Sequence, residues 1–130
     1  MKKITLGLSL FLLLIQNGFA KSDTEWNKLI DNESDEYWKQ SYKCDKEALN
    51  HKYSGNVNEC LKSIVLQRKK PNGRLNITIT YLNTGVLYQY STKNYIKAYQ
   101  YYIKAAKLGN IKAQSNLDIL CRQHSWVCKQ

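Results

Sequence analysis

The chain has 130 residues, with 20 basic and 10 acidic side chains and a formal net charge of +10. This length suits a single domain, because a fold of about this size buries roughly two thirds of its unfolded surface. The sequence contains no Gly-x-Ser-x-Gly turn, no His-Glu-x-x-His pair and no phosphate-binding glycine loop, which excludes the enzyme classes that these motifs define.

The chain opens with the features of an export signal. Lys2 and Lys3 precede an apolar run from Ile4 to Ile15, and small residues stand at Gly18 and Ala20. The apolar run is too short for a comfortable membrane span, so an uncleaved anchor is the less favoured alternative. We predict a secretory signal peptide over residues 1–20, cleaved after Ala20, with no membrane anchor and a periplasmic or secreted destination.

Charge is distributed unevenly along the rest of the chain. Lys21 to Glu59 holds six basic and nine acidic residues, whereas Cys60 to Gln130 holds twelve basic residues and one acidic residue, Asp118. Such an excess should attract an anionic partner and speed its encounter. We expect a protein partner with an acidic surface; nucleic acid is not expected, because no nucleic-acid-binding motif is visible.

The four cysteines are Cys44, Cys60, Cys121 and Cys128. An even count in an exported chain predicts disulfide bonds. Three pairings remain open, of which Cys44–Cys60 with Cys121–Cys128 is the simplest. The second bond would require the last helix to end or turn between its two cysteines, since seven helical residues rise about 10.5 Å.

The N-terminal half is predicted to be helical. Ser22-x-x-Glu25 is typical of a capping box, and apolar spacing predicts a helix over Asp23–Trp38 that Asp31-Asn32 could divide. Further helices are predicted over Asp45–Tyr53 and Val57–Arg68.

The C-terminal half begins with a loop, Arg68–Arg74, which holds the only proline. Leu75–Tyr81 alternates like a strand, but the pattern continued to Tyr90 fits a helix equally well. Ile96–Leu108 is predicted as a helix that Gly109 ends in a left-handed conformation, and Ile111–Cys121 as the start of the next.

Glycine, tyrosine and alanine recur at characteristic positions between Tyr81 and Leu120. The pattern resembles the Sel-one-like repeat, a relative of the tetratricopeptide repeat, in which small residues let two helices approach closely. The resemblance implies a helical protein-binding scaffold without catalytic residues. Thr84, Asp118 and Cys121 depart from it. The matching residues are Gly85, Tyr88, Ala98, Tyr102, Ala105, Ala106, Gly109, Ala113 and Leu117.

Solenoid units rely on neighbouring units to bury their faces, so one repeat needs caps. We therefore predict an all-α fold, a short helical-repeat (αα-hairpin) domain with N-terminal capping helices and disulfide staples. Its parts are a signal peptide over 1–20, a helical segment with a basic loop over 21–74, and the repeat hairpin with a C-terminal cap over 75–130. The stretch from Gly55 echoes that from Gly109, which leaves open a degenerate earlier repeat.

Basic and aromatic residues share one ridge of the helix over Ile96–Leu108. The ordinary interpretation is a solvated lysine face; the functional one is a docking surface for an acidic partner, with tyrosine anchors. The predicted partner-binding residues are Lys93, Lys97, Tyr101, Lys104, Lys69, Lys70, Arg74 and Tyr90.

Other chemistry-bearing residues have simpler interpretations. Cys121-x2-His124-x3-Cys128 offers three zinc ligands where a structural site needs four, and a disulfide competes for two, so no metal and no cofactor are predicted. Trp126 is expected to plug the core or, if exposed, to anchor an interface. His51 is interpreted as a surface residue.

The acidic residues are interpreted as solvated surface carboxylates rather than catalytic pairs, which need a shielded site. They are Asp35, Glu36, Asp45 and Glu47.

Together these features predict an exported, non-catalytic protein-binding module. Its most specific form would be an immunity protein that neutralises a toxic effector, delivered for example by type VI secretion. The alternatives are an envelope adaptor, a secreted host-interaction protein, a polyanion-binding protein and a small wall-active enzyme.

Overall fold

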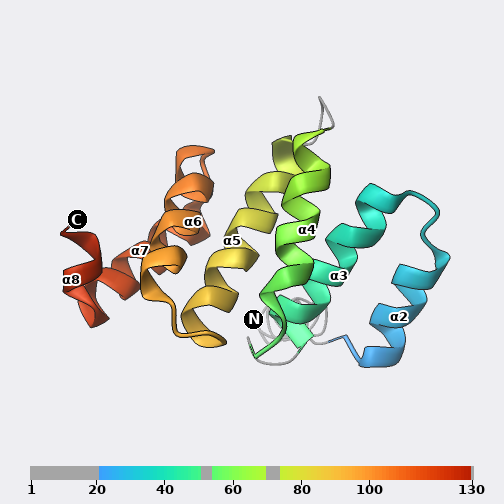
Figure 1. Ribbon diagram of the computed structural model, residues 1–130, viewed down its shortest axis with the longest axis horizontal. Helices are drawn as coiled ribbons and strands as arrows, with labels where there is room; N and C mark the ends of the chain where they lie inside the picture. The colour runs from blue at the N-terminus through green and yellow to red at the C-terminus, as the bar shows by residue number, and fades with distance from the viewer. Residues whose placement is uncertain (1–20, 51–53, 70–73, 130) are drawn as a thin grey trace, which may run out of the picture.

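The structure, a computed structural model, describes residues 21–50, 54–69 and 74–129. These residues form helices without any strand, which confirms the all-α prediction, and the helices follow one another along the long axis from α2 at one end to α8 at the other (Figure 1). The helices are α2 (Asp23–Asn32), α3 (Glu36–Asn50), α4 (Val57–Arg68), α5 (Arg74–Tyr90), α6 (Tyr95–Lys107), α7 (Ile111–Gln123) and α8 (Ser125–Cys128).

The predicted helix over Asp23–Trp38 is two helices in the structure. Ser22 caps α2 by accepting a hydrogen bond from the Glu25 backbone N–H at 3.2 Å, but α2 ends at Asn32. The Asp35 carboxylate then accepts from the backbone N–H groups of Tyr37 (2.8 Å) and Trp38 (3.3 Å), and these donors have no intrahelical partner at the start of a helix. Asp35 therefore begins α3, so the helix predicted from Asp45 in fact starts at Glu36.

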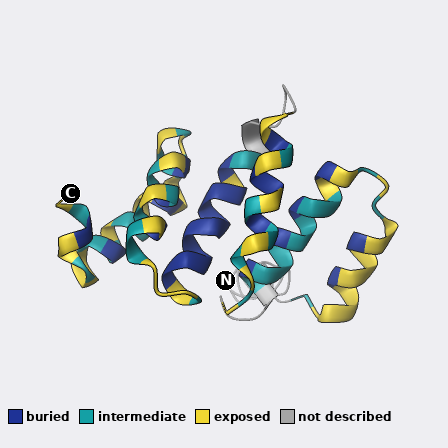
Figure 2. Ribbon diagram, viewed as in Figure 1, coloured by how far each residue is buried: buried dark blue, intermediate teal, exposed yellow. Residues whose placement is uncertain are grey.

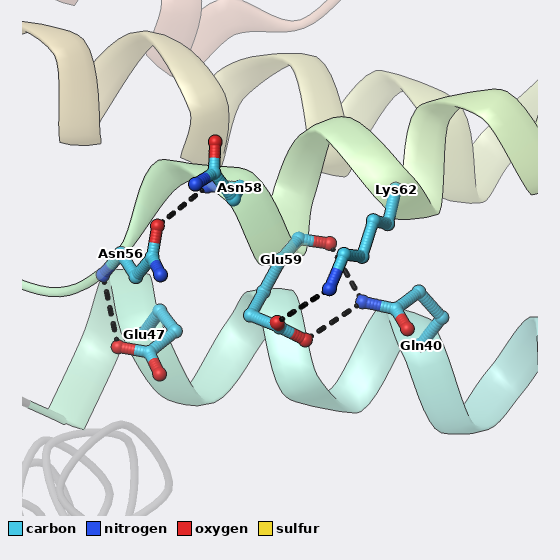
Figure 3. A network of polar contacts seen from close by, with 6 residues as sticks. All are labelled: Gln40, Glu47, Asn56, Asn58, Glu59 and Lys62. Carbon is cyan, nitrogen blue, oxygen red and sulfur yellow. Dashed lines mark hydrogen bonds and ion pairs between the residues drawn. The ribbon is translucent and has the colours of Figure 1, made fainter.

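Helices α3 and α4 form a hairpin that a disulfide holds closed. Cys44 and Cys60 are bonded, with Cα atoms 4.4 Å apart, and both are fully buried. Near the connection between the two helices, the Asn56 N–H donates to the Glu47 carboxylate at 3.0 Å (Figure 3). Across the helices the Gln40 amide donates to both the backbone carbonyl and the carboxylate of Glu59, each at 2.9 Å (Figure 3).

Glu59 is the charged centre of this polar contact. Its carboxylate lies 3.4 Å from the Lys62 ammonium (Figure 3). Burial by itself would raise the pKa of Glu59, but the hydrogen bonds from Gln40 and Lys62 and the attraction of nearby ammonium groups outweigh burial and lower that pKa.

Helix α5 is the central element of the stack. It packs against α3, α4 and α6, and every residue from 80 to 89 is buried (Figure 2). A helical stretch that is covered on all sides needs no polar face, so the sequence from 80 to 89 shows only a weak helical period. This explains why Leu75–Tyr81 could also be interpreted as a strand. In the structure the segment is part of helix α5.

Part of the α5 core is polar. The buried Gln67 amide nitrogen on α4 lies 2.7 Å from the hydroxyls of Ser63 and Thr80 and 3.1 Å from that of Ser41. The group joins α3, α4 and α5, and its hydrogen bonds specify how the three helices meet, because a buried polar atom without a partner is costly. The Gln67 carbonyl oxygen is itself buried without a partner.

Helices α5 and α6 approach closely through Gly85. A β-carbon built at Gly85 would lie 2.6 Å from both Cδ1 and Cε1 of the Tyr102 ring, a separation that real side chains do not adopt. Tyr102 is fully buried, and its hydroxyl donates to the Gln89 side chain at 2.7 Å. The missing side chain at Gly85 is thus the space that the Tyr102 ring fills.

Gly109 ends α6 as predicted, with a left-handed φ of 91°. The Gly109 N–H donates to the Ala106 carbonyl at 2.9 Å and the Asn110 N–H to the Ala105 carbonyl at 3.1 Å, the pattern of a Schellman motif. Asn110 then caps α7 by accepting from the Ala113 N–H at 2.8 Å.

The C-terminal hairpin confirms the geometric requirement of the second disulfide. Helix α7 ends at Gln123, His124 turns the chain, and Cys121 bonds Cys128 on α8 with Cα atoms 5.7 Å apart. Val127, 1% exposed, plugs this end of the core, whereas Trp126 is 53% exposed. The core role expected for Trp126 belongs to its neighbour, because a one-residue step on a helix turns the side chain by about 100°.

The helices recur in pairs. The first helices of the three hairpins, α3, α5 and α7, begin at residues 36, 74 and 111, which are 38 and 37 residues apart. The two segments that echo each other at Gly55 and Gly109 both supply asparagine caps, Asn56 and Asn110. They begin α4 and α7, the second helix of one pair and the first helix of another, so the two segments do not occupy equivalent positions in the helix pairs.

Candidate partner-binding surface

Three tyrosines on α5 and α6 form a continuous aromatic platform. Tyr88 and Tyr101 stack with ring centroids 5.6 Å apart and planes 19° apart. Tyr81 and Tyr101 lie 6.1 Å apart at 44°. Tyr81 and Tyr88 are two turns apart on α5 and largely buried, and Tyr101 on α6 is half-buried between them, so one ring bridges the two helices.

Two exposed lysines of α6 lie over this platform. The Lys97 ammonium is 5.5 Å from the centroid of Tyr88. The Lys104 ammonium is 4.9 Å from the centroid of Tyr101 and 5.6 Å from that of Tyr81. These separations allow cation–π attraction, which restrains long side chains that would otherwise sample many rotamers. We call these five residues, Tyr81, Tyr88, Lys97, Tyr101 and Lys104, the tyrosine–lysine surface.

The tyrosine–lysine surface is positively charged, because the ammonium groups of Lys97 and Lys104 lie on it. Burial raises the pKa of Tyr88. Burial, followed by proximity to Tyr88, raises the pKa of Tyr101 even though the charges of Lys97 and Arg68 act to lower it. Tyr88 and Tyr101 therefore stay protonated at neutral pH and can donate hydrogen bonds. The sequence from Arg74 to Lys107 contains no aspartate or glutamate, so the hairpin itself supplies no carboxylate to neutralise the lysines.

The structure divides the predicted partner-binding residues. It brings Lys97, Tyr101 and Lys104 together. Lys93 lies in the α5–α6 turn with a left-handed φ of 57°, and Lys69 follows the end of α4. Lys70 lies outside the described residues, as does the side chain of Arg74.

Tyr90 belongs to a different surface. It lines a cavity of about 90 Å³ with Leu49 of α3 and Lys112 of α7. This cavity opens beside the α5 residues Leu82 and Val86, apart from Tyr81 and Tyr88.

The sequence interpretation missed Tyr81 and Arg68, and it assigned Tyr88 to the repeat-like pattern alone. Tyr81 and Tyr88 are seven residues apart, a spacing that places both on one helical face. That signal was available but ambiguous while Leu75–Tyr81 could be a strand. Arg68, at the end of α4, acts electrostatically on Tyr101, and only the packing of α4 against α5, which in turn packs against α6, brings it there.

The residues of the repeat-like pattern fill the contacts between the last helices. Gly85 accommodates Tyr102, and Gly109 makes the turn. Tyr88 joins the aromatic platform. Ala98, Ala105 and Ala113 are fully buried at close helix contacts, whereas Ala106 and Leu117 are partly buried against the same core.

The carboxylates have individual structural roles. Asp35 caps α3, and Glu47 accepts from the Asn56 backbone. Asp45 is not the solvated surface group expected from sequence: it is half-buried on α3 and accepts a hydrogen bond from Asn83 of α5 at 2.9 Å. Burial raises its pKa to about 6, against the opposing effects of Asn83 and Lys21.

Of the two histidines, only His124 lies within the described residues. The ring of His124 stacks on Tyr95 with centroids 3.8 Å apart, and the two cysteines flanking it are bonded to each other, which leaves neither as a thiolate. Within residues 21–50, 54–69 and 74–129, no cluster of three or more His, Cys, Asp or Glu is arranged to hold a metal ion. His51 is outside the described residues.

The fold and this surface define a small all-α protein of stacked helical hairpins, clamped by two disulfides of the kind found in an oxidising, extracytoplasmic environment. None of the described helices combines the length and apolar character needed to cross a membrane. Comparison of the chain with protein-family models, with curated proteins and with solved structures gives no match.

Proposed function

We propose that this chain is an exported protein-binding module without catalytic activity, whose partner presents an acidic surface. The observation that carries the proposal is the tyrosine–lysine surface: two exposed ammonium groups over a tyrosine platform, on a hairpin whose sequence has no acidic residue. Aromatic anchors beside cations are typical of interface hot spots.

The scaffold suits such a role because the hairpin with the surface lies between two braced hairpins. Cys44–Cys60 closes the hairpin before it and Cys121–Cys128 closes the hairpin after it. A rigid surface loses less conformational entropy when it binds. We propose further that residues 1–20 are a cleaved signal peptide and that the chain is a short relative of the Sel-one-like repeats. The 38- and 37-residue recurrence of its helix pairs supports the latter.

In its most specific form the module is an immunity protein that covers the active site of a toxic effector. Rigid docking with charge complementarity would give the fast association that neutralising a toxin requires. An envelope adaptor or a secreted host-interaction protein would use the same surface without blocking an enzyme.

Affinity capture tests the proposal. Oxidised Lys21–Gln130 is immobilised and exposed to envelope extract of its own strain, with washes at low and high salt. One stoichiometric protein that survives high salt supports a dedicated partner, and protection of cells that co-express it with a toxic partner supports immunity. Complete release at high salt, or capture of anionic polymers alone, would overturn the protein-binding role.

A further inference from the structure

We infer that the tyrosine–lysine surface recognises an acidic amphipathic helix, which packs along α6 and places two carboxylates two turns apart on its own surface. This inference rests on the proposed protein-binding function and specifies the partner's chemistry. It starts from the positions 97, 101 and 104, which are spaced by four and three residues and so form one ridge of α6.

The ridge alternates charge and apolar surface. Lys97 and Lys104 are exposed at its two ends, and the half-buried ring of Tyr101 lies between them. Seven helical residues separate the lysines by a rise of about 10.5 Å. A ligand whose carboxylates repeat the same backbone rise, with an apolar group between them, therefore faces both lysines and the ring at once.

Of an α-helix and a β-strand, only the helix repeats that spacing on one face. A partner helix repeats it at i and i+7, because two helices share the same rise per residue, and its residues at i+3 and i+4 face Tyr101. A strand rises about 3.3 Å per residue and alternates faces, so side chains on one face are about 6.6 or 13.2 Å apart. A helix thus fits both lysines at once, and a strand fits one.

The tyrosine platform makes the ridge more than a solvated lysine face. Lys97 is restrained over Tyr88, and Lys104 over Tyr101 and Tyr81. Pairing with a carboxylate then immobilises side chains that are already partly ordered, which lowers the entropic penalty of binding. Arg68 adds positive potential near Tyr101 from the neighbouring helix.

Lys107 offers a matched control within the same helix. It is exposed in the last turn of α6, as Lys104 is, yet among the three lysines of α6 only Lys97 and Lys104 lie over a described aromatic ring. Replacing either lysine with glutamine removes one positive charge from the hairpin. A difference between Lys104→Gln and Lys107→Gln therefore reports position and not net charge.

The experiment measures fluorescence anisotropy of labelled helical peptides with oxidised Lys21–Gln130 at about 0.15 M salt, where charges beyond about 8 Å are screened. One peptide carries Glu at i and i+7 with Leu at i+3 and i+4. The second has the same composition with the second Glu moved to i+5, off the ridge. We expect the first to bind at least fivefold more tightly. Lys97→Gln and Lys104→Gln should each weaken it about threefold to fivefold, and Lys107→Gln less than twofold.

Equal binding of the two peptides, absence of binding, or equal effects of Lys104→Gln and Lys107→Gln would overturn the inference and point to diffuse charge. Urea unfolding of each variant verifies that the fold is intact. The Lys97→Gln/Lys104→Gln double variant is also used in the affinity capture. If it retains the same stoichiometric protein as the unmodified chain, the helix-recognition inference falls while the protein-binding function stands.

Discussion

The contact between Gly85 and Tyr102 makes a sharp prediction for the substitution Gly85→Ala. On helix propensity alone this change should stabilise α5 by about 0.5–1 kcal/mol, because alanine loses less backbone entropy than glycine. The structure predicts instead that Gly85→Ala lowers the stability of the protein. The new methyl group would lie 2.6 Å from two ring carbons of Tyr102, which is fully buried and cannot swing into solvent.

The magnitude follows from what the ring must do. Forcing a methyl group into a packed core costs about 1–3 kcal/mol. Any shift of the ring also stretches the 2.7 Å hydrogen bond from the Tyr102 hydroxyl to Gln89, and a buried group left without a partner costs about 1–3 kcal/mol. After subtracting the propensity gain, we expect a net loss of about 2 kcal/mol, or about 10 °C in Tm for a domain of this size.

Urea unfolding of oxidised Lys21–Gln130, followed by circular dichroism, measures the loss. A double-mutant cycle isolates its cause: in a Tyr102→Ala background the cavity accepts the methyl group, so Gly85→Ala should then be neutral or stabilising. Gly109→Ala is the control for backbone strain alone, since Gly109 has a φ of 91° but open space around its α-carbon. A Gly85→Ala protein as stable as the parent, or the same loss in both backgrounds, would refute the packing argument.

Three further changes have defined outcomes. Lys93→Gly should raise the free energy of unfolding by about 0.5–1 kcal/mol in urea titration, because Lys93 adopts a left-handed φ of 57° that glycine adopts without strain; a decrease would contradict this. Since burial raises the pKa of Asp45 from 3.8 to about 6, folding favours its protonated form, and the stability that this provides is lost as the pH rises through 6. Asp45→Asn keeps a hydrogen-bonding group toward Asn83. Its free energy of unfolding should therefore exceed that of the parent by about 1–3 kcal/mol at pH 8, and the difference should vanish below pH 4. A difference that does not change with pH would show that Asp45 does not titrate this way. Replacing both Cys44 and Cys60 with serine should lower stability by about 3 kcal/mol on the chain-entropy model, measured against the parent under non-reducing conditions, and an unchanged midpoint would exclude that contribution.

Local signals in the sequence predicted most helix boundaries. Val57–Arg68 matches α4, and the helix expected over Ile96–Leu108 is shifted by one residue from α6. Asn56 and Asn94 cap these helices directly before their first residues, so residues close in the sequence define where the helices begin. The start of α3 was missed because the Asp35 cap lies within a stretch whose apolar spacing continues across the break.

The candidate surface could be predicted only in part. Lys97, Tyr101 and Lys104 share a ridge of one helix, so spacing alone grouped them. Tyr81 comes from another helix, and Tyr90 was placed with the wrong neighbours because its contacts depend on how α3, α5 and α7 meet. A pattern within one helix gives the direction of each side chain from that helix, but it does not give the identity of the helix it faces.

The sequence by itself determined that this protein is helical, that Gly109 ends a helix, and that a bond between Cys121 and Cys128 requires a turn between them, because these features depend on backbone geometry over a few residues. Only the tertiary structure selected one cysteine pairing from three, buried every residue of α5 from 80 to 89, shielded Asp45, and placed tyrosines of α5 beneath lysines of α6. These outcomes depend on contacts between residues distant in the chain, whose energies come from burial and close packing, and such contacts exist only once the helices are stacked.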